Sequence, residues 1–227
     1  MLAVVVLLPS PAASGSDADF QKARENMVRF QIKSRGISNP DVLTALATVP
    51  RHLFVPEKYR EQAYHDYPLP IGSGQTISQP YIVALMTDLL KLEPSHRVFE
   101  LGTGSGYQAA VASRLAGAVF TVEIYEQLAE SAKKRLESIG YPNVYVKLGD
   151  GYFGWEDEAP FDAIIVTAAA DHIPPPLIEQ LKPGGRLIIP LGSPFSVQQL
   201  VLVLKDLEGK VTEEPLIAVR FVPLLGH

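Results

Sequence analysis

The sequence carries a glycine-rich segment, Gly102-Thr103-Gly104-Ser105-Gly106, directly after a short apolar run. Because glycine has no Cβ atom, such a turn allows a ligand to lie against the backbone N–H groups at the start of the next helix. Carboxylates stand at the ends of the next two apolar runs, at Glu123 and at Asp150 beside Gly151. The first can accept hydrogen bonds from ribose hydroxyls, and the second from an adenine amino group. The pattern therefore predicts a cofactor that contains adenosine.

The spacing of the glycines favours S-adenosylmethionine over a nicotinamide dinucleotide. The dinucleotide fingerprint Gly-x-Gly-x-x-Gly would place its third glycine at position 107, which is Tyr107 here. S-adenosylmethionine has no pyrophosphate, so the helix need not open for two phosphates. Glu100, just before the loop, fits an acidic residue near the amino-acid end of this cofactor. Glu123 alone does not discriminate, since dinucleotide-binding proteins use the same device. We expect S-adenosylmethionine as the cofactor and S-adenosylhomocysteine as its product.

Composition excludes several other chemistries. The 227 residues include no cysteine, so disulfides, thiolate catalysis and cysteine–zinc sites are ruled out. The five histidines are scattered without a metal-ligand spacing, so no metal site is predicted. The formal net charge is -5 and no basic run stands out, which argues against a nucleic-acid partner. Apolar residues make up 47% of the chain, which suits a globular protein with a sizeable core.

The first 18 residues read as a separate leader. The apolar run Leu2–Leu8 is followed by small residues and prolines, as in a secretory signal, but no basic residue precedes it. It is also too short to span a bilayer, which needs about 20 apolar residues. We expect a loosely ordered leader and no membrane association, and export is the alternative. A cytoplasmic location is favoured because S-adenosylmethionine is made in the cytosol.

The remainder divides into an extension, residues 19–92, and a core, residues 93–227. The extension predicts helices at Asp19–Arg35, from Asn39 to Pro50 and from Pro80 to Leu90, with an extended loop at Tyr67–Pro80. The core alternates apolar runs with helical stretches, which predicts a doubly wound, mostly parallel α/β sheet with an antiparallel C-terminal edge. Its helical stretches are Tyr107–Leu115, Tyr125–Ile139 and Pro175–Leu181. Its seven expected strands are Val98–Leu101, Val119–Ile124, Val144–Leu148, Ala163–Thr167, Leu187–Leu191, Leu200–Leu204 and one around Ile217–Val222.

Several longer motifs resemble known families. The segments Val98–Tyr107, Gly149–Gly151, Phe161–Thr167 and Leu181–Leu187 resemble the Rossmann-like core of class I methyltransferases. The upstream blocks Val49–Pro56 and Pro68–Pro80, with Arg220–Leu224 near the end, are similar to protein-L-isoaspartate O-methyltransferases. The resemblance covers roughly residues 20–225. It implies transfer of a methyl group to the free α-carboxylate of L-isoaspartyl residues in damaged proteins and peptides, which initiates repair through a succinimide.

The resemblance also implies residue roles. Ser78 would hold the substrate carboxylate, and Thr76 and Ile77 would place main-chain atoms near the methionine moiety. From spacing alone, Ser78 reads instead as a helix-start serine before Pro80. The segment Val219, Arg220, Phe221 and Val222 would offer backbone hydrogen bonds to the substrate peptide, with a plain edge strand as the alternative. Tyr107 and Trp155 are expected to pack in the core.

Two other functions remain open from the sequence. One is a methyltransferase for another acceptor, such as a small molecule. The other is a non-catalytic binding protein that retains the fold. Methylation of nucleic-acid bases is disfavoured, because the fourth core strand continues into Thr167-Ala168-Ala169-Ala170 and lacks an Asn/Asp-Pro-Pro-aromatic motif. We expect the protein to act as a monomer.

Overall fold

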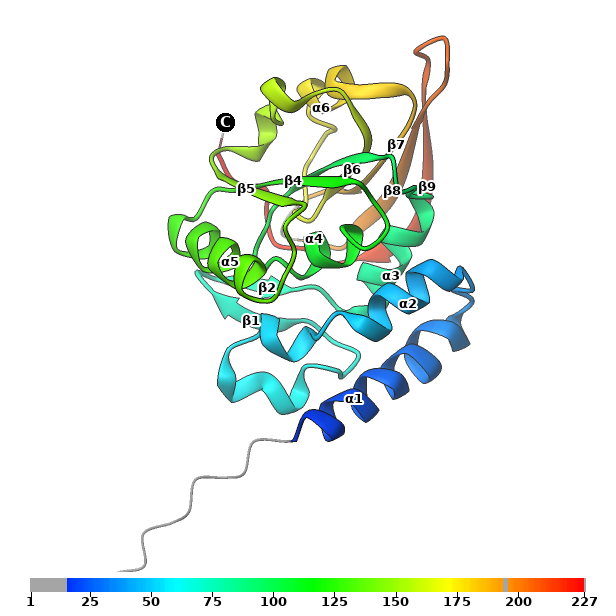
Figure 1. Ribbon diagram of the computed structural model, residues 1–227. Coiled ribbons are helices and arrows are strands. Elements are labelled where there is room, and N and C mark those ends of the chain that lie inside the picture. The colour runs from blue at the N-terminus through cyan, green and yellow to red at the C-terminus, as the bar shows by residue number, and fades with distance from the viewer. Residues whose placement is uncertain (1–15, 194–195, 227) are drawn as a thin grey trace, which may run out of the picture.

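The computed structural model of the chain describes residues 16–193 and 196–226 (Figure 1). The expected leader, residues 1–18, lies outside this range except for its last three residues. Ser16 caps the first helix, because its side chain accepts from the Asp19 N–H while the Asp19 carboxylate accepts from the Ser16 backbone. The helix therefore begins at Asp17, two residues before the expected start. The division into leader, extension and core stays a prediction.

The centre of the fold is a seven-stranded sheet with the order β5-β4-β3-β6-β7-β8-β9. The first five of these strands run parallel, and β8 and β9 join antiparallel at one edge. The predicted fold class, an α/β doubly wound and mostly parallel sheet with an N-terminal helical extension, is confirmed. The strands are β3 (Arg97–Leu101), β4 (Ala118–Glu123), β5 (Val144–Leu148), β6 (Phe161–Val166), β7 (Leu181–Leu191), β8 (Gln198–Lys205) and β9 (Val211–Val219).

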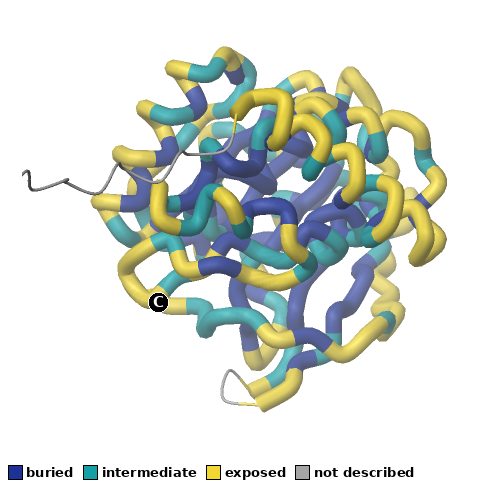
Figure 2. The backbone as a smooth tube through the Cα atoms, turned by 90° about the horizontal axis from the view of Figure 1, so that it is seen from below, coloured by how far each residue is buried: buried dark blue, intermediate teal, exposed yellow. Residues whose placement is uncertain are grey.

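Helices cover both faces of this sheet, as the apolar strands require. In Figure 1, α3, α4 and α5 lie on one face and α6 on the other. Alternate residues of β3 pack against the helices on opposite faces of the sheet, since Val98 packs with α3 and α4 and Phe99 packs with α6. Figure 2 shows the resulting buried interior inside an exposed shell. The α-helices are α1 (Asp17–Asn26), α2 (Pro40–Thr48), α3 (Pro80–Leu89), α4 (Tyr107–Ala112), α5 (Glu126–Ser138) and α6 (Pro175–Gln180).

The extension contains more irregular backbone than its sequence pattern predicts. The expected helix over Asp19–Arg35 continues from α1 through a π-helical turn, η1, and a 3-10 turn, η2, and ends at Gly36 with φ 96°. The hydrophobic spacing carries no sign of this change in helix type. The irregular helical turns are η1 (Met27–Ile32), η2 (Lys33–Arg35), η3 (Arg51–Phe54), η4 (Glu57–Gln62), η5 (Gly151–Phe153) and η6 (Glu156–Glu158).

The segment Tyr67–Pro80 is not simply an extended loop. It contains an antiparallel hairpin of β1 (Leu69–Gly72) and β2 (Gln75–Ile77). Ser73 and Gly74 connect the strands with φ values of 50° and 71°, as expected of a tight hairpin turn with positive φ at both positions. The Pro, Gly and Ser content hid these short strands. The hairpin places Ser78, which follows Ile77, beside residues of the 93–227 segment.

The C-terminal strand also differs from expectation. We expected a strand around Ile217–Val222, whereas β9 runs over Val211–Val219 and the chain then leaves the sheet edge. Pro223 forms a parallel bridge with Ala169, so this last segment crosses the carboxyl ends of the central strands. No helix in the described ranges has both the length and the apolar character that a membrane span requires.

The extension is anchored by a buried aromatic cluster. The Phe20 and His52 rings stack with centroids 4.1 Å apart, and His52 Nδ1 lies 2.7 Å from the Tyr64 hydroxyl. Met27 and Met86, the two methionines in the described ranges, are buried at 0% and 1% exposure. Burial lowers the pKa of His52, and the nearby positive charge of Arg24 acts in the same direction. The folded chain therefore favours neutral His52.

We predict that His52 makes stability depend on pH below neutrality. Because its pKa is lower in the folded state than in the unfolded state, its contribution is present above the ordinary histidine pKa and is lost as pH falls. The free energy of unfolding from urea titrations should decrease between pH 7 and 5, by at most about 1.4 kcal/mol per pH unit for one group. His52→Gln should flatten this slope, and identical slopes for both proteins would contradict the assignment.

Candidate active site

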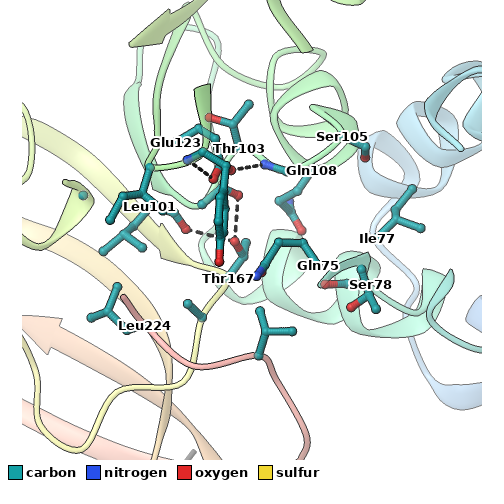
Figure 3. Close-up of a pocket in the computed structure, with 18 of the residues that line it drawn as sticks. Gln75, Ile77, Ser78, Leu101, Thr103, Ser105, Gln108, Glu123, Thr167 and Leu224 are labelled. Carbon is teal, nitrogen blue, oxygen red and sulfur yellow. Dashed lines mark hydrogen bonds between the residues drawn. The ribbon is translucent and has the colours of Figure 1, made fainter. Parts of the chain in front are cut away.

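A cavity lies at the carboxyl ends of β3, β4 and β6, where the strand order changes direction (Figure 3). This is the position at which open α/β sheets bind ligands. About 740 Å³ of space lies between its atoms, part of it open to solvent. Nine of the predicted cofactor and catalytic residues line it, namely Thr76, Ile77, Ser78, Gly102, Thr103, Gly104, Ser105, Glu123 and Gly151.

The glycine loop is held against the sheet by hydrogen bonds. The Gly102 N–H donates to the Val122 carbonyl at 2.9 Å, and the Thr167 hydroxyl lies 2.9 Å from the Leu101 carbonyl and 2.8 Å from that of Gly102. Gly102 has φ 93°, and a Cβ atom there would overlap the Thr167 hydroxyl. Gly106 begins α4 with φ 86° and is not among the residues that line the cavity. The loop therefore needs glycine for both its backbone angles and its close packing.

Glu123 ends β4 and faces the cavity. One carboxylate oxygen accepts from the Gly104 N–H at 2.7 Å, and the other accepts from the Tyr125 N–H at 3.0 Å. These bonds orient the side chain while leaving further lone pairs, since a carboxylate offers about four acceptor sites. The same carboxylate thus fixes the glycine loop and can accept hydroxyl groups from a ligand. Leu101, Val122 and Ile124 supply apolar walls beside it.

Glu100 lies beneath the loop and is fully buried. The Thr121 hydroxyl donates to one of its oxygens at 2.5 Å and lies 2.7 Å from the Thr103 hydroxyl. Burial raises the pKa of Glu100 to about 8, against the lowering effect of the Thr121 hydrogen bond. Glu100 is not among the lining residues of the cavity, so its expected contact with the cofactor stays a prediction.

Asp150 occupies the end of the third core strand, as expected, but its carboxylate contacts protein groups. It begins η5 and accepts from the Tyr152 N–H at 2.9 Å. The C-terminal segment lies against it, because a Cβ atom on Gly226 would overlap the carboxylate. Gly151 lines the cavity and Asp150 does not. A role for Asp150 toward adenine stays a prediction.

Ser78 lies where the first cavity meets a second one. The second cavity, about 1000 Å³ including open solvent, is lined by Ser78 together with Val219, Arg220, Phe221 and Val222. The side chain of Ser78 lies at the edge of the first cavity in Figure 3. The alternative of a helix-start serine is wrong, because Gln79 is the N-cap of α3 and no side chain caps that helix. Ser78 therefore has access to two separate binding spaces.

The segment after β9 forms one wall of the second cavity. The Phe221 N–H donates to Gln198 Oε1 at 2.9 Å, and the Val222 carbonyl accepts from the Ala169 N–H at 2.8 Å. Only Val219 belongs to the edge strand, so the alternative of a plain edge strand fails for the other three residues. These bonds fix the position of the backbone along the cavity.

Other lining residues escaped the sequence analysis. Thr167 could have been found, since it directly follows β6 at the same sheet end as the glycine loop. Leu225 comes from the returning C-terminus and had no local signal, whereas Leu224 ends the motif Arg220–Leu224 that carried the family resemblance but had no predicted role. Tyr107 lines the cavity but also packs in the core, with its ring 5.5 Å from Phe54. The remaining ones are Gln75, Val83, Leu101, Gln108, Val122, Ile124, Tyr125, Ala168 and Pro223.

Comparisons with known proteins agree with this arrangement. The family model described as protein-L-isoaspartate(D-aspartate) O-methyltransferase (PCMT) matches residues 22–227. Protein-L-isoaspartate O-methyltransferase 2 of Shewanella sediminis is 58% identical over 94% of this chain and 87% of its own. A protein of the same name from Syntrophobacter fumaroxidans is 53% identical over 98% of this chain and 96% of its own.

Solved structures give the same result. A structure titled protein-L-isoaspartate O-methyltransferase superposes with a TM-score of 0.80 at 32% identity, covering 89% of this chain and 66% of that one. A protein from Plasmodium falciparum, described as a putative enzyme of the same kind in complex with S-adenosyl-L-homocysteine, superposes with a TM-score of 0.75 at 26% identity. It covers 89% of this chain and 98% of its own.

Proposed function

The chain belongs to the protein-L-isoaspartate O-methyltransferase family, and we infer from this premise that it methylates the free α-carboxylate of L-isoaspartyl residues with S-adenosylmethionine. The methyl ester then cyclises to a succinimide without enzyme help, and hydrolysis returns part of the residues to normal aspartate. One structural observation carries the assignment to this site: Ser78 stands between the cavity of the glycine loop and the cavity of residues 219–222. A transferase needs such a junction, because donor and acceptor must meet there.

The residues of the first cavity fit S-adenosylmethionine. Gly102 and Gly104 have positive φ, and a Cβ atom on them would press against Thr167 and Ile71, so glycine keeps the loop compact at the wall of the cavity. Glu123 presents lone pairs for two ribose hydroxyls, and Leu101 and Val122 provide apolar surface for the adenine ring. Thr76 and Ile77 line the end of the cavity next to Ser78, which suits the methionine moiety. When bound, the cofactor supplies a methyl group on a positively charged sulfur.

The acceptor needs no general base. A carboxylate has a reference pKa near ~4, so at neutral pH the substrate already carries its nucleophilic oxygen. The enzyme therefore has to position that oxygen in line with the methyl carbon, and positioning of this kind contributes up to roughly 7–11 kcal/mol in favourable cases. The Ser78 hydroxyl donates to one carboxylate oxygen and leaves the other free to attack.

The second cavity accounts for substrates of many sequences. Its wall of residues 219–222 is fixed by hydrogen bonds to Gln198 and Ala169. We propose that this backbone pairs with the peptide next to the isoaspartyl residue. Backbone hydrogen bonds do not depend on side chains, so one groove accepts damaged sites in many proteins. We further propose that the enzyme acts as a monomer in the cytoplasm, where its cofactor is made, without a nucleic-acid or membrane partner.

The function is tested by an assay with two isomeric peptides. We expect methyl transfer from radiolabelled S-adenosylmethionine to a peptide with one L-isoaspartyl residue, and none above background to the same peptide with normal aspartate. The reason is that only the isomer has its free carboxylate where Ser78 reaches it. Equal labelling of both would indicate another acceptor, and binding of S-adenosylhomocysteine without any transfer would indicate a non-catalytic protein.

Replacing Ser78 tests the role of its hydroxyl. A hydrogen bond to a charged group contributes about 1.5–3 kcal/mol, so Ser78→Ala should lower kcat/KM for the isoaspartyl peptide roughly 10- to 150-fold. The affinity for S-adenosylhomocysteine, measured by calorimetry, should change less than threefold. Ser78→Thr retains a hydroxyl and serves as the control. Unchanged kcat/KM in the alanine variant would exclude this role.

Glu123 is predicted to govern cofactor affinity. Glu123→Ala removes the acceptors for the ribose and also the bond that holds the Gly104 N–H. Loss of charge-assisted bonds of this kind should weaken S-adenosylhomocysteine binding at least tenfold in calorimetry. Glu123→Gln keeps one oxygen acceptor and should show an intermediate loss. Affinities equal to that of the unmodified protein in both variants would refute the assignment.

A further inference from the structure

Arg51 in η3 has a side chain that is entirely buried, with 0% exposure. Its Nε donates to the Ala63 carbonyl at 2.6 Å, and its Nη2 donates to the Ser78 carbonyl at 2.8 Å. The guanidinium carbon lies 4.8 Å from the centroid of the Tyr107 ring. Arg51 thus joins the N-terminal extension directly to the backbone of the serine at the junction of the two cavities.

The positive charge of Arg51 has no carboxylate partner among the described residues, although the neighbouring Tyr107 side chain favours the charged form. In the described part of the chain, no Asp or Glu oxygen lies within 4 Å of its guanidinium, and its Nη1 has no hydrogen-bond partner. Burial lowers the pKa of Arg51 to about 10, so the group is still cationic at neutral pH. Fully buried charges are rarely found without a partner, because removal from water is unfavourable. The missing partner calls for an explanation.

The geometry around Ser78 provides one. The Arg51 guanidinium lies over the ring of Tyr107, and Tyr107 lines the same cavity as Ser78. From the 2.8 Å contact with the Ser78 carbonyl, a carboxylate bound at the hydroxyl of that residue would lie on the order of 8–10 Å from the guanidinium. The Arg51 side chain is fully buried, and charge interactions that involve a buried group are screened less than those in water.

We propose that Arg51 is a positioning residue whose buried charge acts as the remote counter-ion of the substrate carboxylate bound at Ser78. The inference rests on the proposed function and adds a source of carboxylate affinity to it. Arg51 does not touch the substrate. It holds the Ser78 backbone and favours a negative charge in front of the Ser78 side chain. At 8–10 Å, the interaction corresponds to roughly a two- to twentyfold preference for a charged over a neutral ligand.

The chain offers a matched control in Arg24. This arginine also ties the extension together, donating to the Ala47 carbonyl at 2.6 Å and to the Tyr64 hydroxyl at 3.3 Å. It makes no hydrogen bond to Ser78 among the contacts of the described residues. Arg24→Met therefore removes a similar set of hydrogen bonds but keeps the positive charge of Arg51 next to Ser78.

The test compares two peptides on the complex with S-adenosylhomocysteine, which cannot transfer a methyl group. One peptide carries an L-isoaspartyl residue, and the other carries the same residue with its α-carboxylate converted to a carboxamide. Calorimetry gives the ratio of the two dissociation constants. Arg51→Gln keeps a hydrogen-bond donor but removes the positive charge. Arg51→Met replaces the side chain with an apolar one, so that no unpaired charge remains in the interior. Arg51→Lys keeps the positive charge. Cofactor affinity and circular dichroism establish that each variant is folded.

We expect the preference for the carboxylate to fall two- to twentyfold in Arg51→Gln and Arg51→Met, while the carboxamide affinity changes less than twofold. Arg51→Lys and Arg24→Met should keep the preference of the unmodified protein. Equal weakening of both peptides, an unchanged preference in a folded neutral variant, or loss of the preference in Arg51→Lys would overturn the proposal. If the unmodified protein neither binds nor methylates the isoaspartyl peptide, the proposed function itself fails.

Discussion

The whole site depends on the hydrogen bonds that hold the glycine loop at the point where the strand order of the sheet changes direction. The Thr167 hydroxyl bonds to the carbonyls of Leu101 and Gly102, so the end of β6 fixes the end of β3. Glu123 then fixes Gly104 from the end of β4. Three parallel strands thus define one cavity floor. Neighbouring strands set the shape of the loop, because Val122 and Glu123 accept from the N–H groups of Gly102 and Gly104. The Thr103 hydroxyl, 2.7 Å from that of Thr121, adds a contact from the loop itself.

The N-terminal extension, residues 19–92, supplies walls of the cavity that the sheet does not provide. The hairpin β1–β2 brings Thr76, Ile77 and Ser78 over the cavity, and Arg51 secures the last of these through its carbonyl. The returning chain after β9 closes the opposite side. The glycine loop and Glu123 line only the first cavity and residues 218–221 line only the second, whereas Thr76, Ser78, Thr167 and Val222 line both. This division explains how a widespread cofactor fold can serve one particular acceptor.

Periodicity predicted the central strands well because each is a short buried run. β3 begins one residue before its expected start, and β5 has the expected bounds. β7 begins at Leu181, six residues before the expected Leu187, since Lys182-Pro183-Gly184-Gly185 reads as a turn. Local pattern could not show that Leu224 and Leu225 fold back over the cavity, or that Glu100 is buried beneath the loop. Those outcomes depend on contacts between segments that are distant in the sequence. The prediction of the methyl acceptor came from the longer motifs that resemble the family.

One feature of the core bears on how the protein itself ages. The chain has no thiol, and the thioethers of Met27 and Met86 are sealed inside the fold. Thiolates and exposed methionines are the side chains that oxidants attack first. Serine, glutamate and glycine, which make up the site, are inert to the same reagents. In the part of the chain that the structure describes, oxidants therefore meet no thiol and no exposed thioether. An enzyme that repairs one form of protein ageing is thus protected there against a second form, oxidation.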